Sequence, residues 1–469
     1  MIAPSLHPEA VQAACRPRRR WAFGLTPRAI VLLAAGFLWL IPGFWIGGVS
    51  YAMPAWAALV LLAALADGLR LPRAAQIAAG RTWSNAPALD STTEIELTIE
   101  NHGRTVLECR LVDDLSPALV AQPATLRLRA FPRLPASLRY TVEPTERGDW
   151  PAGSLYVRYR SPLALAERWA VAPLAQQVRV YPALRRAEEQ QIFLARSRQL
   201  DLQLRRARQR GLGREFESLR EYREGDDLRD ICWTASARRG SPITRQYQME
   251  RSQAVWIVLD CGRLMRARVA MTGQGGGPAT PRHAKLDYAC SAALALAQLA
   301  LYSGDRVGLL AYGQGTQQRL LPGHGAAHMR QIIEALALAR PESAEADHLR
   351  ATAVLHRLQP RRALILWITD LAETAMRPEV VEAASQLLRR HLLLFVAMAQ
   401  PEVETIAEMQ PHNLGQMYLA AAAQGMAARR DALLAQLEEQ GALTFDLNPQ
   451  ALTSRLLNQY LAVKERAMV

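Results

Sequence analysis

Lysine is almost absent from this chain of 469 residues. Only Lys285 and Lys464 occur among the 56 basic residues, and the other 54 are arginines. The formal net charge is +13, because 43 acidic residues accompany the basic ones. Arginines and carboxylates are interleaved nearly everywhere, whereas a nucleic-acid-binding protein concentrates its cations in a patch or stripe. We therefore expect no nucleic-acid partner.

Cysteine is also scarce, and its spacing matches no framework. The chain has five cysteines, an odd number, and none of them forms a CxxC pair. They are Cys15, Cys109, Cys232, Cys261 and Cys290. This usage excludes a disulfide scaffold or a zinc site and indicates reduced thiols in a reducing compartment.

Several catalytic motifs are missing as well. The sequence has no Gly-Lys pair and hence no Walker A loop, no HExxH and no GxSxG. The glycine-rich run at 273–278 follows no predicted strand directly, as a dinucleotide-binding turn would. No catalytic base, nucleophile or phosphate-binding loop is indicated, so we predict that the protein is not an enzyme.

What the sequence does have is one long apolar segment. From Ala29 through Ala66, 38 consecutive residues include no Asp, Glu, Lys, Arg or His. As one helix this segment would measure about 57 Å, nearly twice the hydrocarbon core of roughly 30 Å. Small residues and a proline between 47 and 54 can break the helix. We therefore predict a transmembrane hairpin over 29–69, with spans near 29–46 and 51–69.

The flanks of this hairpin predict its orientation. Five arginines between 16 and 28 precede the first span, and Arg70 and Arg73 follow the second. The positive-inside rule places both flanks in the cytoplasm, so residues 1–28 would be a basic cytoplasmic tail. A cleaved signal peptide is the competing interpretation. The apolar stretch is too long for it, and no small-residue cleavage site follows.

Two kinds of hydrophobic pattern divide the remaining chain. Apolar and polar residues alternate in the runs 92–101, 124–131, 136–144, 153–160 and 176–184. This pattern predicts an antiparallel β-sandwich of about seven strands over 75–183. Continuous apolar runs at 253–260, 305–312, 363–370, 391–398 and 441–447 alternate with helical patterns at 284–302, 326–339, 379–390, 420–440 and 449–464. That order predicts a doubly wound, mostly parallel α/β domain over 251–469.

Two carboxylates stand where a ligand crevice is expected. Asp260 and Asp370 end two of the apolar runs, and ligands bind outside the carboxyl ends of the strands in such sheets. Together with Thr352 and Thr369 they provide the oxygen ligands that Mg²⁺ prefers. Residues 261–265 instead provide a thiol, a guanidinium and apolar groups. We therefore predict a degenerate metal site, with a helix-capping role for each aspartate as the alternative.

The connecting segment 184–250 combines dense charge with aromatic residues. We expect a charged helix at 188–210 and, in 213–245, arginines held by Glu215, Glu221, Asp226 and Asp227. Such a segment would tie the β-sandwich to the α/β domain. Partner binding is the alternative, because arginine and aromatic residues are enriched in interface hot spots. The candidate residues are Glu215, Phe216, Leu219, Arg220, Tyr222, Gly225, Asp226, Arg229, Trp233 and Arg238.

The same segment resembles a known family. The run GLGREFESLREYREGDDLRDICWTASARR at 211–239 is similar to the signature of the bacterial domain-of-unknown-function 58 family. Residues 146–150, 161–163 and 304–308 resemble further landmarks of that family. The resemblance implies a von Willebrand factor A-like domain in a protein anchored in the bacterial inner membrane. It also implies a MoxR-type AAA+ ATPase as the partner, with client proteins on which that ATPase acts.

Two departures from the family pattern limit what carries over. Domains of the A type bind metal through an Asp-x-Ser-x-Ser loop and a later Thr and Asp. Asp260 and Asp370 match that pattern, but Gly262 and Leu264 replace both serines. Cys232 stands where the family carries an aspartate.

We therefore expect a non-enzymatic interaction protein, an adaptor or partner of the ATPase in protein maturation or complex assembly. A Mg²⁺-dependent ligand-binding module of the A type is the first alternative. A hydrolase that uses Asp260 or Asp370 as a base is the second.

Overall fold

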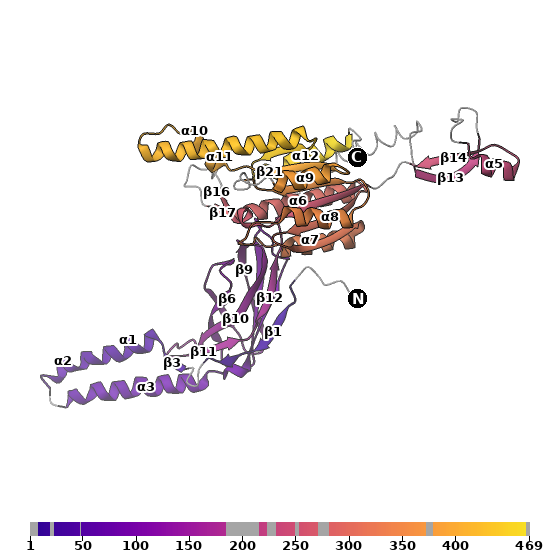
Figure 1. Cartoon of the computed structure of the whole chain (residues 1–469). Coiled ribbons are helices and arrows are strands. Elements are labelled where there is room, and N and C mark those ends of the chain that lie inside the picture. The colour runs from indigo at the N-terminus through magenta and orange to yellow at the C-terminus, as the bar shows by residue number, and fades with distance from the viewer. Residues whose placement is uncertain are drawn as a thin grey trace. The chain divides into compact units, whose positions relative to one another are not determined.

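A computed structural model divides the chain into two compact units, residues 1–181 and 182–469. The described residues are 8–18, 23–46, 48–183, 215–222, 231–248, 253–270, 281–371 and 379–465. Figure 1 shows the helices and strands of both units. The helix predicted at 188–210 lies outside the described residues.

The first unit contains two antiparallel sheets. One sheet has the order β1 (Val11–Ala14), β4 (Ile77–Trp83), β5 (Thr93–Asn101), β9 (Pro135–Pro144) and β7 (Leu119–Gln122). The other has the order β2 (Arg16–Pro17), β11 (Ala166–Ala172), β10 (Gly148–Arg160), β6 (Leu107–Leu115) and β8 (Leu126–Ala130). In addition, β12 (Gln176–Val180) pairs with β10, and β3 (Phe23–Leu25) pairs with β11.

The segment predicted as a basic tail takes part in both sheets. β1 pairs with β4, while β2 and β3 pair with β11. These strands have only two to four residues each, which is too short for an alternating pattern to be recognised. Backbone pairing to edge strands holds them, so the first unit includes residues on both sides of the apolar segment.

A buried arginine joins the two sheets. Arg81 of β4 is fully buried, and its Nε donates to Asp113 Oδ2 of β6 at 3.0 Å. The guanidinium also donates to the carbonyl oxygens of Leu174 and Gly153, both at 3.0 Å. Tyr140 of β9 donates its hydroxyl proton to Asp113 Oδ2 at 2.5 Å. A buried charge is costly unless it is paired and hydrogen-bonded. The three partners of Arg81, and Tyr140 as a second partner of Asp113, meet that requirement.

The apolar segment forms two antiparallel stretches of helix. The first comprises α1 (Pro27–Ala35), η1 (Gly36–Trp39) and α2 (Leu40–Gly43), and the second comprises η2 (Val49–Tyr51) and α3 (Ala52–Arg70). The Trp56 indole donates to the Leu32 carbonyl at 2.8 Å and joins the two stretches. Among the described helices, α3 alone is long and apolar enough to cross a membrane, whereas Pro27–Gly43 is a shorter apolar helix. The two predicted spans are therefore both helical but unequal in length.

The end of α3 is fixed to the second sheet by Asp67. This carboxylate is 2% exposed and accepts a hydrogen bond from Ser161 Oγ at 2.6 Å. It also accepts from the backbone N–H groups of Leu165 and Ala166, both at 3.1 Å. Arg168 donates to the Gly68 carbonyl at 3.1 Å, where a cation favours the helix C-terminus. The helical hairpin and the β-domain are thus parts of one compact unit.

The second unit is built on a six-stranded mixed sheet. Its order is β19 (Thr316–Gly323), β18 (Arg306–Tyr312), β15 (Ala254–Asp260), β20 (Leu364–Thr369), β21 (Leu392–Met398) and β22 (Leu443–Leu447). All neighbours pair in parallel except β18 and β19. The five strands predicted from apolar runs are confirmed. The antiparallel β19 was not predicted, because its sequence TQQRLLPG has neither a continuous apolar run nor an alternating pattern.

Helices cover both faces of this sheet (Figure 1). The helices are α6 (Lys285–Tyr302), α7 (Gly325–Leu338), α8 (His348–Leu358), α9 (Glu379–Leu388), α10 (Pro401–Glu408), α11 (Leu414–Glu439) and α12 (Leu452–Glu465). One apolar core lies under α6, α7 and α12, and the other lies under α8, α9 and the end of α11. Shorter pieces are β13 (Glu215–Glu221), α5 (Trp233–Arg239), β14 (Ile243–Gln248), η5 (Arg263–Arg266), β16 (Arg268–Ala270), β17 (Pro281–Ala284) and, in the first unit, η3 (Ala74–Gln76).

We expect Asp67→Ala to destabilise the first unit by about 2–4 kcal/mol. The substitution leaves two backbone N–H groups and a hydroxyl without their acceptor, and each such buried group costs about 1–3 kcal/mol. Calorimetric unfolding of the detergent-solubilised chain measures the effect. Asp114→Ala, at an exposed position on β6, is the control, and an equal response of the two variants would contradict the anchoring role of Asp67.

Candidate functional site

The structure brings Asp260 and Asp370 to one edge of the sheet in the second unit. Asp260 ends β15, and Asp370 directly follows β20, which is the neighbouring parallel strand. Their carboxylates are 3% and 1% exposed. Both line the same cavity, which has a volume of only about 20 Å³. The two aspartates therefore share a crevice at the carboxyl ends of the strands, but that crevice is nearly filled.

Asp370 is held by a lysine. Lys285, the first residue of α6, donates from Nζ to Asp370 Oδ2 at 2.6 Å, and both side chains are buried. Gln400 Nε2 donates to both Asp370 oxygens at 3.2 Å. A guanidinium nitrogen of Arg430 on α11 lies 3.6 Å from Asp370 Oδ1. A carboxylate at the end of β20 thereby contacts α6, the residue before α10, and α11.

Asp260 has a separate set of partners. Its Oδ2 accepts from the Thr369 hydroxyl at 2.6 Å, and its Oδ1 accepts from the Gly262 N–H at 2.6 Å. Burial raises the pKa of Asp260 to about 6, although these two hydrogen bonds lower it. The negative charge of Asp370 raises this pKa further. The pKa of Asp260 is thus well above that of an ordinary aspartate.

A hydrogen-bonded aromatic cluster lies beside the crevice. The Tyr312 hydroxyl is 2.9 Å from His348 Nδ1 and accepts from the Trp367 indole N–H at 2.7 Å. Burial lowers the pKa of His348 to about 4, so its ring is neutral at pH 7. Thr352 on α8 is buried, and its hydroxyl has no hydrogen-bond partner within the described ranges. Of the two threonines considered as metal ligands, only Thr369 contacts an aspartate.

The donor set does not fit a divalent cation. Mg²⁺ needs near-octahedral oxygen coordination at about 2.0–2.1 Å. Here the oxygens of Asp370 accept from Lys285 and Gln400, and those of Asp260 accept from Thr369 and a backbone N–H. Within the described residues, no three His, Cys, Asp or Glu side chains are grouped as metal ligands. The ammonium of Lys285 supplies beside Asp370 the positive charge that a metal ion would supply.

Arg430 extends this charged network toward the far edge of the sheet. Its Nε and a terminal nitrogen donate to Asp446 of β22 at 2.8 and 2.7 Å. A second cavity, of about 260 Å³, is lined by Gln400, Arg430 and Asp446 together with residues of α10 and α11. Sequence reasoning missed Lys285, Gln400 and Arg430.

The signature segment is described only in part. Of the candidate residues, Gly225, Asp226 and Arg229 lie outside the described residues, as does Asp227. The backbone of residues 215–221 forms β13, which pairs antiparallel with β14. At its end Tyr222 donates its backbone N–H to the Pro242 carbonyl at 2.9 Å.

The part of this segment around α5 exposes apolar surface. Trp233 begins α5 and is 72% exposed, Leu219 on β13 is 42% exposed, and Arg238 in the last turn of α5 is also exposed. The neighbouring Cys232 is buried, and its N–H donates to the Ile243 carbonyl at 2.8 Å. The sulfur therefore belongs to the packing of the segment, whereas the tryptophan faces solvent.

The strand order and the helices on both faces define the second unit as an α/β domain with a mixed, mostly parallel sheet. Residues 218–430 match the family described as "Protein of unknown function DUF58". This part of the chain is therefore a DUF58 domain, and the resemblance predicted from the signature is confirmed.

Two relatives of known sequence are described only as uncharacterized. Uncharacterized protein Mb1516 of Mycobacterium bovis and uncharacterized protein Rv1480 of Mycobacterium tuberculosis are each 27% identical over 195 residues. Each alignment covers 41% of this chain and 56% of the relative, so the match spans about half the length of these relatives.

Similar solved structures include the conserved hypothetical protein BatB from Bacteroides thetaiotaomicron, at 14% identity, with 40% of this chain and 98% of that chain covered and a TM-score of 0.24. Another is proximal thread matrix protein 1 from the mussel byssus, at 10% identity, with 44% and 46% covered and a TM-score of 0.26. Neither likeness bears on function.

We expect Lys285→Ala to destabilise the second unit by about 3–5 kcal/mol, because it leaves the Asp370 carboxylate buried without its ammonium partner. Removal of the Lys285 side chain leaves space beside Asp260 and Asp370. Millimolar Mg²⁺ should bind there and restore part of the lost stability. The wild-type chain should unfold identically in Mg²⁺ and in EDTA. Denaturant unfolding followed by the fluorescence of the buried Trp256 and Trp367 measures both effects.

Lys464→Ala is the matched control for this experiment. Lys464 also donates to an aspartate, Asp305 Oδ2 at 3.0 Å, in the same unit. Its removal should lower stability without creating a response to Mg²⁺. Stabilisation of the wild-type chain by Mg²⁺ would show instead that the crevice binds metal despite Lys285.

The raised pKa of Asp260 predicts a pH-dependent effect of Asp260→Asn. Between about pH 4 and pH 6 the folded chain binds more protons at this site than the unfolded chain, so the wild type loses stability as the pH rises. Asparagine does not ionise and avoids that loss. The stability of the variant relative to wild type should therefore rise with pH across this window by up to about 3 kcal/mol. Unfolding curves of both chains at pH 4, 5, 6 and 7 measure this difference in stability. A difference that does not change with pH would contradict the raised pKa of Asp260.

Proposed function

We propose that this protein is a membrane-anchored, non-enzymatic interaction protein. Its partner is a MoxR-type AAA+ ATPase, and together they act on client proteins during maturation or complex assembly. The identity of the partner rests on the family resemblance. The remaining support comes from three features of the described residues, namely the apolar helical hairpin, the strand order of the second unit and an exposed apolar surface on α11.

The hairpin supports membrane anchoring. Along α3, Leu59, Leu62 and Leu69 are 62%, 66% and 73% exposed, and only 22% of its apolar window is buried. A core helix of a soluble protein would bury these side chains. The arginines that flank the hairpin favour a cytoplasmic location for both soluble units in the bacterial inner membrane.

The sheet supports an A-type domain. Numbered along the chain, its strands have the order 3-2-1-4-5-6, with the third strand antiparallel. This topology places the ends of the first and fourth strands at the centre of the crevice, as in doubly wound folds that bind ligands there. In this chain that crevice holds Lys285 and Asp370 in place of a metal.

The single observation that carries the proposal is the exposed apolar surface at the start of α11. Leu414, Met417 and Tyr418 are 71%, 55% and 76% exposed. Their spacing of three and four residues places them on one face of the helix. Clustered apolar and aromatic side chains on a surface mark sites of protein contact. We assign this face to the partner.

We expect the double variant Leu414→Ala, Tyr418→Ala to recover at least tenfold less AAA+ ATPase than wild type in pull-downs from detergent-solubilised membranes. Truncating two interface residues costs enough free energy for that change. The pull-down is performed in ATP and in ADP with the tagged full chain. EDTA should leave recovery unchanged.

Leu321→Ala is the matched control for the pull-down. Leu321 is an apolar residue on the edge strand β19 and is 59% exposed. It should not change recovery. The proposal fails if wild type recovers no AAA+ ATPase in either nucleotide. Loss of recovery with both EDTA and Asp260→Ala would favour the Mg²⁺-dependent module instead.

A further inference from the structure

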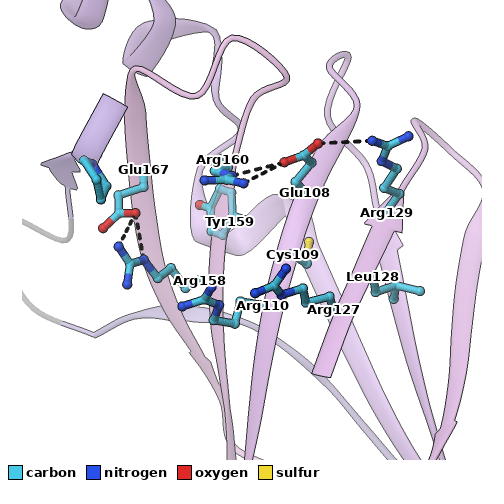
Figure 2. A pocket seen from close by; sticks show the side chains of 11 residues that line it. Glu108, Cys109, Arg110, Arg127, Leu128, Arg129, Arg158, Tyr159, Arg160 and Glu167 are labelled. Atoms are coloured by element: carbon cyan, nitrogen blue, oxygen red, sulfur yellow. Dashed lines mark hydrogen bonds and ion pairs between the residues drawn. The ribbon is translucent and has the colours of Figure 1, made fainter. Parts of the chain in front are cut away.

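An arginine-lined groove lies on the outer face of the second sheet in the first unit (Figure 2). It has a volume of about 530 Å³, within the range of ligand-binding pockets. Its basic lining residues are Arg110, Arg127, Arg129, Arg158 and Arg160. Glu108 and Glu167 are the acidic lining residues, and Pro27 also lines the groove.

The residues that line this groove form two rows across the strands, and in one row the positive and negative charges are equal in number. Across the strands β11, β10, β6 and β8, the register places Glu167, Arg160, Glu108 and Arg129 opposite one another in turn. Arg160 Nε donates to Glu108 Oε2 at 3.1 Å, and Arg129 donates to Glu108 Oε1 at 3.4 Å. Opposite charges directly across from each other stabilise a sheet.

The adjacent row is not balanced. There Arg158, Arg110 and Arg127 stand directly opposite one another on β10, β6 and β8, and Figure 2 shows Arg110 between the other two. Arg158 reaches diagonally to Glu167, with Nε 2.7 Å from Oε2. Arg110 and Arg127 make no ion pair or side-chain hydrogen bond with any residue in the described ranges. Like charges directly opposite are destabilising, so this pair of arginines favours a bound anion.

The groove begins where the chain enters the apolar helices. Pro27 is the first residue of α1 and lines the groove, and it is followed by Arg28 and the uncharged run. Just before it, Gly24 of β3 pairs with Glu167 of the balanced row. If the hairpin lies in a membrane, as the proposed function requires, the part of the groove lined by Pro27 lies next to the layer of lipid headgroups. Juxtamembrane clusters of arginine attract anionic lipids, at about 1 kcal/mol per cation.

We propose that this groove binds the phosphate group of an anionic membrane phospholipid through Arg110 and Arg127. The planar guanidinium matches a phosphate with two parallel hydrogen bonds. Two such groups on neighbouring strands hold one anion between them and remove their mutual repulsion. The headgroup site would fix the β-domain against the membrane surface at the base of the hairpin. This proposal rests on the membrane anchoring proposed above.

The test is lipid titration of the full-length, detergent-solubilised chain followed by native mass spectrometry. Wild type should bind phosphatidylglycerol at least tenfold more tightly than phosphatidylcholine. The double variant Arg110→Gln, Arg127→Gln should lose at least tenfold in affinity for phosphatidylglycerol and keep its affinity for phosphatidylcholine. Its melting temperature should equal or exceed that of wild type, because the variant removes a repulsion. Equal affinities for the two lipids in wild type would overturn the proposal.

Three further arms separate the alternatives. Arg139→Gln, which replaces an exposed arginine on β9 of the other sheet, should bind both lipids as wild type does. Glycerol 3-phosphate or a glutamate-rich peptide that displaces the lipid at equal concentration would assign the groove to a soluble anion or a protein. Extraction of the chain from membranes by alkaline carbonate would contradict the anchoring itself, whereas retention with no lipid preference contradicts only the headgroup site.

Discussion

The buried ion pair between Lys285 and Asp370 is the constraint on which the edge of the α/β domain depends. A carboxylate at this depth is tolerated only when it is paired and hydrogen-bonded. Its partners come from α6, from the residue preceding α10 and from α11. The pair therefore determines how three segments distant in sequence meet the end of β20.

The same principle applies to two other cations among the described residues. Arg81 joins the two sheets of the β-domain through Asp113. Lys464 on the last helix donates to Asp305, which also accepts a hydrogen bond from Tyr460. Both lysines of the chain thus serve as partners of buried aspartates.

Much of the fold follows from sequence pattern. Residues 254–260 and 364–369 are continuous apolar strands, and both lie at the centre of a sheet covered on both faces. The shared edge of Asp260 and Asp370 follows from that reasoning. The strands at 11–25 were missed, because segments of two to four residues carry no period and are held by pairing alone. Arg81 was missed because its partners are distant in sequence.

The position of Lys285 in the sequence indicates its role, although composition alone does not. It stands in the first turn of a predicted helix, where the helix dipole disfavours a cation. A rare lysine in such a position requires a carboxylate nearby, and the end of the adjacent strand provides one. The identity of that aspartate depends on the order of the strands in the sheet. The sequence pattern predicts the strands but not their order. The contacts of Gln400 and Arg430 with Asp370 depend on the strand order as well, because both residues follow β21 in the chain.

The ion pair also bears on how this domain would meet the proposed partner. A metal ion that keeps exchangeable water ligands in such a crevice could bind a carboxylate of the proposed partner directly. The ammonium of Lys285 is buried and already neutralised, so an incoming carboxylate would have to break the pair. Recognition then falls to surfaces outside the crevice, and among the described residues the exposed face of Leu414, Met417 and Tyr418 is such a surface. Arg430 connects the same helix to Asp370 and Asp446, so the proposed partner would bind an element that these charges already hold in place.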